Sequence, residues 1–112
     1  MIFSSVRLIL AAGHEKDATD ILTRYRERTR FLDGCRSCRL YYDASETKSL
    51  MVEEVWSDEG ALNRHLASAS YQEVLLVMEM ASSMPEIRFI PFSEFSGFDR
   101  IERAREGISP PD

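Results

Sequence analysis

The chain has 112 residues, of which 44% are hydrophobic and 29% are charged, and this is the length and composition of one ordinary globular domain. Its net charge of -5 at pH 7 argues against nucleic acid as a partner, because phosphate backbones attract basic surfaces. No apolar run is long enough to cross a membrane and no signal-peptide pattern opens the chain, so we expect a cytoplasmic protein with no membrane partner.

The first element predicted is a strand from Ile2 to Leu10, where one alternating face is fully apolar and the other is mixed. From His14 to about Phe31 the apolar period becomes helical. The buried stripe of this helix is predicted to hold Ala18, Ile21, Leu22, Tyr25 and Thr29, with Leu32 extending it. A left-handed glycine, Gly34, is expected to close the helix.

A hairpin follows, with strands predicted at Cys35–Asp43 and Ser49–Trp56 and a polar loop at 44–48. Neither face of the second strand is uniformly polar. We therefore expect both faces of the sheet to be covered, one by helices and the other by something that a single chain does not supply.

Ser57 is predicted to cap the next helix, with Asp58 and Glu59 beside the positive end of its dipole. The inner stripe of this helix is expected to hold Ala61, Leu62, His65, Leu66 and Ala69. Ser68-Ala69-Ser70 indicates a break, after which a second helical segment should place Val74, Leu75, Met78 and Ala81 inward and end before Pro85.

The last strand is predicted from Glu86 to Gly97, and Pro91 within it favours an edge position because proline lacks a backbone donor. A short helix with Phe98, Ile101 and Ala104 inward is expected over Phe98–Glu106, before a tail that contains two prolines. We divide the chain into a domain of residues 1–97 and a C-terminal helix and tail of residues 98–112.

The order strand, helix, strand, strand, helix, strand predicts an α+β fold of the ferredoxin-like, split β-α-β type with an antiparallel four-stranded sheet. Helices would cover only one face of this sheet, and the other face carries aromatic and aliphatic residues. We therefore expect a homodimer in which two sheets pack face to face as a dimeric α+β barrel.

Cys35 and Cys38 form a CxxC pair inside a predicted strand. Residues three apart on a strand point to opposite faces, and the sequence has no second pair to complete a zinc site. We interpret both as structural cysteines, and a reactive Cys35 in the turn after Gly34 is the alternative.

Several segments carry a resemblance to a known family. They are Glu54-Val55-Trp56, Ala61-Leu62, His65-Leu66, Ser68, Tyr71, Pro85-Glu86-Ile87, and the strand from Gly34-Cys35 to Tyr41-Tyr42-Asp43. In these segments the chain resembles the antibiotic biosynthesis monooxygenase family of dimeric α+β barrels, from Phe3 to about Gly97. The family hosts several chemistries, so the resemblance predicts the fold better than the activity.

The resemblance implies a cofactor-independent monooxygenase that acts on a quinol or an aromatic polyketide-like small molecule, with no metal or cofactor. His65 matches the helix histidine and is the candidate catalytic base, and Trp56 matches an aromatic residue at the strand end. The candidate substrate-binding residues are Tyr41, Arg7, Ser5 and Glu54 for a polar wall, and Leu66, Met78 and Phe89 for an apolar wall.

The alternative is a non-catalytic dimeric module with the same fold, for small-molecule binding or a stress response. In that case His65 and Trp56 are core residues and the cavity beside them is closed or too small for an aromatic ring. A haem-degrading enzyme fits the pattern less well, because that branch uses an asparagine on the first strand where this chain has Ser4, Ser5 and Arg7.

Overall fold

The computed structural model describes residues 1–93 and 97–107, apart from the side chain of Thr47. The elements of this described part, in chain order, are β1 (Ile2–Ile9), α1 (Glu15–Thr29), β2 (Cys35–Asp43), β3 (Glu46–Trp56), α2 (Glu59–Leu66), the short 3-10 helix η1 (Ala69–Tyr71), α3 (Gln72–Met78), β4 (Glu86–Pro91) and α4 (Gly97–Arg105).

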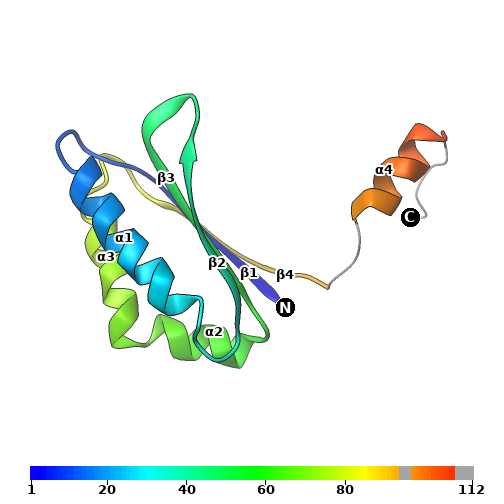
Figure 1. Cartoon of the computed structure of the whole chain (residues 1–112), viewed down its shortest axis with the longest axis horizontal. Coiled ribbons are helices and arrows are strands. Elements are labelled where there is room, and N and C mark those ends of the chain that lie inside the picture. Colours follow the sequence, from blue (N-terminus) through cyan, green and yellow to red (C-terminus); the bar gives the residue numbers. More distant parts are fainter. Residues whose placement is uncertain (94–96, 108–112) are drawn as a thin grey trace.

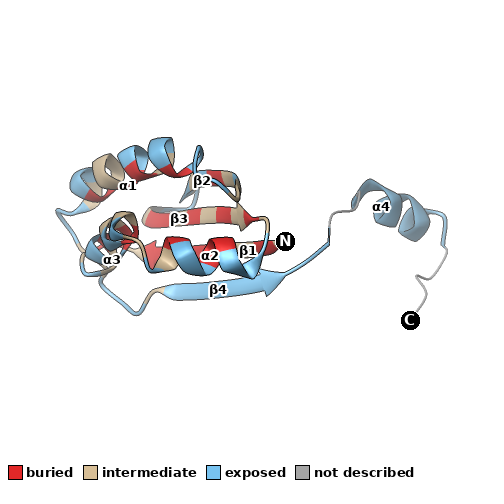
Figure 2. Ribbon diagram, turned by 90° about the horizontal axis from the view of Figure 1, so that it is seen from below, coloured by how far each residue is buried: buried red, intermediate tan, exposed pale blue. Residues whose placement is uncertain are grey.

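The strands form one antiparallel sheet in the order β2-β3-β1-β4, and α1, α2 and α3 cover one face of it (Figure 1). β4 is an edge strand, as Pro91 predicted, and it is exposed along its whole length, beside the helix layer (Figure 2). The ferredoxin-like α+β fold predicted from the order of elements is confirmed.

Side chains alternate between the two faces of the sheet. The face under the helices carries Ser4, Val6 and Leu8 of β1, Leu50, Val52, Glu54 and Trp56 of β3, and Cys38 and Leu40 of β2. The opposite face, called the open face below, carries Phe3, Ser5, Arg7 and Ile9 of β1, Met51, Glu53 and Val55 of β3, Arg39 and Tyr41 of β2, and Glu86, Arg88 and Ile90 of β4.

The main core lies between α1, α3 and the sheet. α1 buries Ala18, Leu22, Tyr25 and Thr29, so the stripe predicted from helical spacing is confirmed at these positions. Leu32 is 43% exposed, which corrects its placement on that stripe: the helix has ended and the chain is turning at this point. A smaller cluster joins the ends of β1 and β3 to α2, through Ile2, Trp56, Ala61 and Leu62.

Three boundaries differ from the sequence-based predictions. Asp58 and not Ser57 caps α2, because its carboxylate accepts a 2.8 Å hydrogen bond from the Ala61 amide. The hairpin turn is shorter than predicted, since β3 begins at Glu46 and Asp43 accepts hydrogen bonds from the amide and hydroxyl of Ser45. β4 ends at Pro91 and does not reach Gly97, and residues 94–96 of the predicted strand lie outside the described part.

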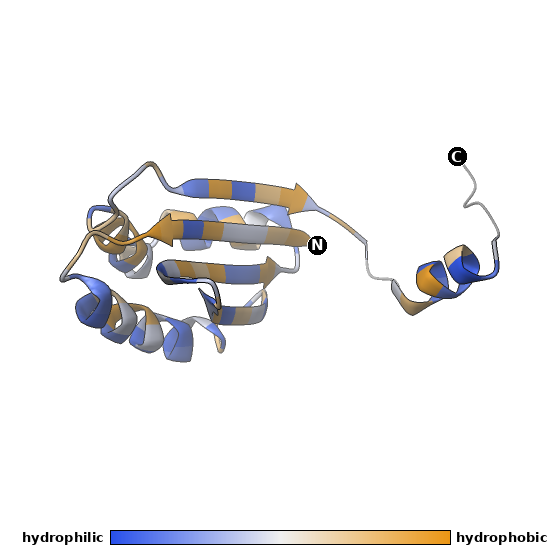
Figure 3. Ribbon diagram, turned by 90° about the horizontal axis from the view of Figure 1, so that it is seen from above, coloured by the Kyte–Doolittle hydropathy of each residue, from blue (hydrophilic) through white to orange (hydrophobic). Residues whose placement is uncertain are grey.

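Two predicted inner faces differ as well. In α3 the buried residues are Val74 and Val77, whereas Leu75 is 48% exposed, because the helix begins after η1 with a rotation that spacing alone does not give. α4 carries Phe98 and Ile101 as an apolar stripe, yet both are exposed, because α4 stands away from the body (Figures 1 and 3).

Cys35 and Cys38 lie on the same face of β2, under the helices, and not on opposite faces as predicted. A register shift between Cys35 and Ser37 causes this, since it adds a residue to one strand and reverses the alternation. Both thiols are free, and burial raises the pKa of Cys35 to about 11 and that of Cys38 further. Neither is therefore a thiolate at neutral pH, which supports the structural interpretation.

Candidate functional site

The site forms where β3 ends and α2 begins. Trp56 is the last residue of β3, and the amide of Ser57 donates to the Gly34 carbonyl at 2.9 Å, which holds the turn against the end of α1. The cap at Asp58 then starts α2 so that His65 falls on its inner stripe. The indole and imidazole rings stack with their centroids 4.5 Å apart and their planes at 28°. The structure thus brings together the two rings that the sequence singled out.

Buried hydrogen bonds connect these rings to Glu54 and Tyr25. The Trp56 indole N–H donates to Glu54 Oε1 at 2.9 Å, and the Tyr25 hydroxyl donates to Glu54 Oε2 at 2.6 Å. The same hydroxyl lies 2.6 Å from His65 Nε2. The edge of the Tyr71 ring contacts both Tyr25 and His65, with centroids 6.5 Å and 5.5 Å away. All of these side chains are buried, so water competes little for their hydrogen bonds.

Burial shifts the ionisation of each of these groups. It raises the pKa of Glu54 and of Tyr25 above their usual values, and the pKa of Tyr71 to about 12. It lowers the pKa of His65 to about 4, so the imidazole is neutral at pH 7. The sequence-based argument relied on the unperturbed pKa of histidine, and the structure replaces it with a neutral, desolvated ring.

His65 Nδ1 is buried and has no hydrogen-bond partner among the described residues. Buried polar atoms are nearly always hydrogen-bonded, so an unsatisfied one needs an explanation. A pocket of about 240 Å³ reaches this ring, and it is lined by Leu32, Asp33, Trp56, Ala61, Arg64, His65 and Ser68. The pocket is open to solvent on the side of the exposed Asp33 and Arg64, and apolar residues make up most of the rest. Such a pocket suits a small, mainly apolar ligand with one polar group.

The family profile of antibiotic biosynthesis monooxygenases matches residues 1–75 of the chain. The chain belongs to this family. None of the curated proteins compared with the chain matches it. Solved structures agree on the fold: a candidate antibiotic biosynthesis monooxygenase from Deinococcus radiodurans is 23% identical with a TM-score of 0.78, and the match covers 87% of this chain and 97% of that one.

Two further structures are similar at the level of the fold. Rv0793 from Mycobacterium tuberculosis is 25% identical with a TM-score of 0.76, over 85% of this chain and 98% of that one. A candidate antibiotic biosynthesis monooxygenase from Nitrosomonas europaea is only 10% identical, yet its TM-score is 0.75 over 82% of this chain and 98% of that one. The antibiotic biosynthesis monooxygenase fold thus persists where little sequence identity remains.

Three of the residues assigned to the polar wall lie on the open face, away from His65. Ser5, Arg7 and Tyr41 alternate with the helix-facing residues of β1 and β2, so the thickness of the sheet separates them from the pocket. Arg7 forms ion pairs there with Asp43 at 3.7 Å and Glu86 at 3.6 Å. Glu54 is the only member of that predicted wall that the structure places in contact with Trp56.

The residues assigned to the apolar wall do not line the pocket at His65. Leu66 is half-buried and packs against both core clusters, and Met78 packs against the main cluster from α3. Phe89 is 44% exposed on β4, where it pairs in register with Ser4.

Tyr25 is the residue of this site that sequence reasoning missed. Its position on the inner stripe of α1 was predicted, but only as packing. A buried tyrosine hydroxyl needs a hydrogen-bond partner, and Glu54 alternates onto the same face as Val52 and Trp56. These two facts could have suggested that a phenol and a carboxylate meet under α1.

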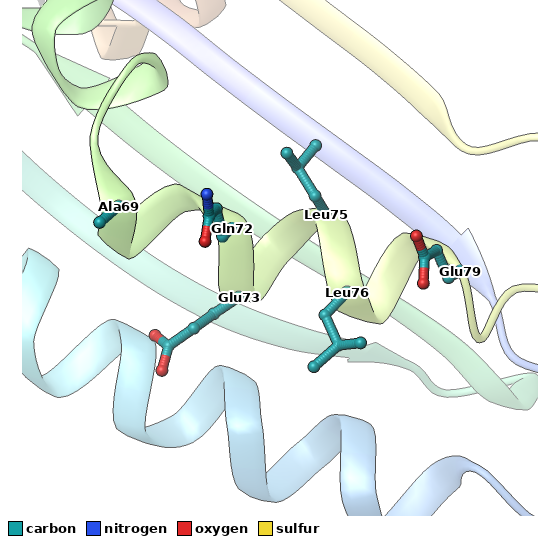
Figure 4. Close-up of a pocket in the computed structure, with 6 residues that line it drawn as sticks. All are labelled: Ala69, Gln72, Glu73, Leu75, Leu76 and Glu79. Atoms are coloured by element: carbon teal, nitrogen blue, oxygen red, sulfur yellow. The ribbon is translucent and has the colours of Figure 1, made fainter.

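Larger hollows lie elsewhere on this family member. A groove of about 490 Å³ follows α3, where Leu76 and Glu73 point toward α1 and Leu75 points the other way (Figure 4). A second, of about 440 Å³, lies beside the ion pair between Arg28 and Glu73. Neither is lined by the hydrogen-bonded groups around Glu54, so we take the smaller pocket at His65 as the candidate site.

The described residues hold no cluster of three or more histidine, cysteine or carboxylate side chains placed to bind a metal ion. Among the same residues, none of the helices combines the length and apolarity that crossing a bilayer requires.

Proposed function

We propose that this protein is a cofactor-independent monooxygenase that oxidises a small aromatic hydroxyl compound in the pocket beside Trp56 and His65. One observation carries the proposal: His65 Nδ1 is a buried ring nitrogen without a hydrogen-bond partner among the described residues, and an open pocket of about 240 Å³ is lined in part by the same side chain. A hydroxyl group of a bound ligand would supply the missing hydrogen bond.

The size of the pocket narrows the substrate class. Pockets that bind drug-sized ligands usually enclose about 300–1,000 Å³, and this one is smaller. It therefore favours a quinol of one or two rings over a polycyclic polyketide, and it argues against haem. The Trp56 ring, stacked on His65, offers an aromatic surface at the same place.

The chemistry needs a base and a site with little water. A quinol or phenol that has lost its proton is itself a reductant and can pass an electron to O2, so the substrate supplies the electrons. His65 is the candidate base, since it is neutral at pH 7, its side chain lines the pocket, and its Nδ1 has no hydrogen-bond partner among the described residues. The buried rings around His65 exclude water on the side of the imidazole away from the pocket, and a bound aromatic ring would displace water from the pocket itself.

The test is oxygen consumption with a panel of benzoquinols and naphthoquinols. The wild-type protein should consume oxygen above the blank rate, and His65→Ala should lower the rate about 10²–10⁴-fold, as loss of a general base does. The matched control is His14→Ala, which removes the other histidine of the chain from an exposed position and should leave the rate unchanged. A folded wild-type protein that oxidises no member of the panel would contradict the proposal.

The second candidate function is a non-catalytic binding module, and one observation favours it: the His65 side chain is only 1% exposed. The chain has a single tryptophan, so quenching of its fluorescence would report binding at Trp56 directly. Saturable quenching by a quinol without oxygen consumption would support the binding module, and quenching together with turnover would support the monooxygenase.

We also propose a homodimer that forms through the open face. Phe3, Val55 and Ile90 form a row across β1, β3 and β4 on this face, and Ile90 is 47% exposed. Met51 and Tyr41 form a second apolar pair on β3 and β2, and a polar row lies between the two: Arg88, Ser5, Glu53 and Arg39. Exposed apolar side chains gathered on one sheet face often mark an interface, and a second copy of the chain would cover them symmetrically and could pair with the charged residues between them.

Light scattering after size-exclusion chromatography should therefore give twice the chain mass of 12.9 kDa. Val55→Lys should shift the protein to the monomer, because it would place a charge in the middle of the proposed interface. Gln72→Lys on the exposed side of α3 adds the same charge outside the interface and should leave the dimer intact. A wild-type monomer at micromolar concentration would rule the interface out.

A further inference from the structure

The buried groups behind His65 form a continuous path for a proton. His65 Nε2 lies 2.6 Å from the Tyr25 hydroxyl oxygen, which lies 2.6 Å from Glu54 Oε2. Glu54 Oε1 accepts from the Trp56 indole at 2.9 Å. The path thus begins at the imidazole beside the pocket and ends at a carboxyl group that is 3% exposed.

The donors and acceptors along this path determine which ring nitrogen of His65 carries the hydrogen atom. The Trp56 indole can only donate, and the Tyr25 hydroxyl has one hydrogen to donate. When Glu54 is ionised, both of them donate to it, and the Tyr25 oxygen then accepts from His65 Nε2–H. Nδ1 is in that case the unprotonated nitrogen, and it is left to accept a hydrogen bond from a ligand, since it has no partner among the described residues.

When Glu54 is protonated, the two hydrogen bonds that join Glu54, Tyr25 and His65 reverse. The carboxyl donates to the Tyr25 oxygen, the Tyr25 hydroxyl donates to His65 Nε2, and Nδ1 carries the hydrogen. The indole still donates to the other carboxyl oxygen. The charge of Glu54 therefore decides whether His65 presents an acceptor or a donor on its free nitrogen.

We propose that Glu54 is the final acceptor of the proton that His65 removes from the ligand, and that Tyr25 transfers it; the proposal rests on the proposed function of the pocket. In this step the ligand O–H bond breaks and Nδ1–H forms. Nε2–H breaks as the proton passes to the Tyr25 oxygen, and the original Tyr25 proton passes to Glu54 Oε2. The ligand is left as an anion, and Glu54, Tyr25 and His65 are left neutral.

The charge balance favours this route over His65 acting alone. Before the step the only charge on the path is the Glu54 carboxylate, and after it the only charge is the ligand oxygen. Without the transfer, the same buried space would hold a carboxylate, an imidazolium and a ligand anion, and each buried charge carries a desolvation cost. Burial lowers the pKa of His65 to about 4 and raises that of Glu54, so both shifts act in the same direction.

The groups that face Glu54 come from four elements, and none of them carries a charge at neutral pH. They are Tyr25 of α1, Cys35 and Cys38 of β2, His65 of α2 and Tyr71 of η1. Glu54 is therefore the group on this path whose charge the surrounding groups do not balance, and burial raises its pKa. Neither Glu54 nor Tyr25 touches the pocket, so both act through His65 as positioning residues.

The experiment measures the tautomer of His65 by nitrogen NMR on protein labelled at histidine, with His14 as the internal reference. In the wild type, His65 should be the Nε2–H tautomer where Glu54 is ionised and change to Nδ1–H as the pH falls and Glu54 takes up a proton. Glu54→Gln should hold the Nδ1–H tautomer wherever His65 is neutral, because the amide donates to Tyr25 as the protonated carboxyl does. Glu53→Gln, the neighbouring position on the open face, should behave as the wild type.

Kinetics give the second readout. With a quinol that the wild type oxidises, kcat of Glu54→Gln and of Tyr25→Phe should fall about 10²-fold or more at unchanged KM, and Glu54→Gln should lose the rise of kcat with pH. A wild-type His65 that is Nδ1–H where Glu54 is ionised would overturn the relay, as would full kcat in Glu54→Gln. If the tautomer changes as expected but no quinol is oxidised, the relay stands and the proposed function fails.

Discussion

Gly34→Ala is expected to destabilise the protein by about 2–5 kcal/mol, a large part of the stability of a small domain. Gly34 has φ +84°, in the left-handed region where a side chain adds strain. A Cβ atom at this position would lie 2.5 Å from Ala61 Cβ and 3.3 Å from Ser57 Oγ. The turn after α1 would have to move away from α2, which carries His65. Urea unfolding followed by circular dichroism measures the loss.

Two further variants separate the strain from the contact. Gly13 has φ +90° with nothing within 4 Å of an added Cβ, so Gly13→Ala should show the backbone strain alone, about 1–2 kcal/mol. Ala61→Gly removes the atom that Gly34→Ala would strike, and the double variant should recover part of the loss. Equal losses in Gly34→Ala and Gly13→Ala would show that the approach of α2 to this turn is not a tight contact.

The position of His65 illustrates what could be predicted from the sequence. Helical spacing placed Ala61, Leu62 and His65 on one stripe, and strand alternation placed Trp56 at the end of the preceding strand, and both are confirmed. Local patterns suffice here because a turn of two residues, Ser57 and Asp58, joins the two elements. With so short a connection, the end of the strand and the first turns of the helix are bound to lie close together.

The partners of His65 could not be predicted in the same way. Tyr25 is 40 residues from His65 in the sequence, and their contact depends on how far along the sheet α1 lies, which no local spacing determines. The misplacement of Ser5, Arg7 and Tyr41 has a different cause. Alternation separates them from the helix-facing residues of their own strands, and the prediction did not apply this alternation when it placed them in one wall with Glu54.

The cysteines show a third kind of limit. Alternation predicted opposite faces for Cys35 and Cys38, and a single register shift reversed the result. The shift occurs directly after Gly34, where the chain passes from the turn into β2. An irregularity of this kind leaves no period in the sequence, so alternation alone could not predict it.

His65 should make the protein less stable as the pH falls from about 6.5 to about 4. Burial lowers its pKa from about 6.5 in the unfolded chain to about 4 in the folded protein. Between these two pH values the unfolded chain binds a proton at this histidine and the folded protein does not, which favours unfolding. The stability contributed by His65 is complete above pH 6.5 and is lost on acidification, by about 3 kcal/mol in total. Glu54 has the opposite effect on stability. Its pKa is higher in the folded protein than in the unfolded chain, so above the usual pKa of a glutamate the folded protein binds the proton more readily and acidification favours folding.

Comparison of the wild type with His65→Phe isolates the histidine contribution, since phenylalanine keeps a ring against Trp56 and leaves the Tyr25 hydroxyl bonded to Glu54. Urea unfolding at a series of pH values should show the wild type losing about 3 kcal/mol more than His65→Phe between neutral pH and pH 4. His14→Asn is the control for removal of a histidine from the surface, and its curve should follow the wild type. Parallel curves for the wild type and His65→Phe would mean that His65 takes up a proton in the folded protein, with Glu54, 3.7 Å away, as its ion-pair partner. That result would also weaken the proposed proton relay. A protonated His65 paired with an ionised Glu54 could keep the proton taken from the ligand, so no transfer to Glu54 would be needed.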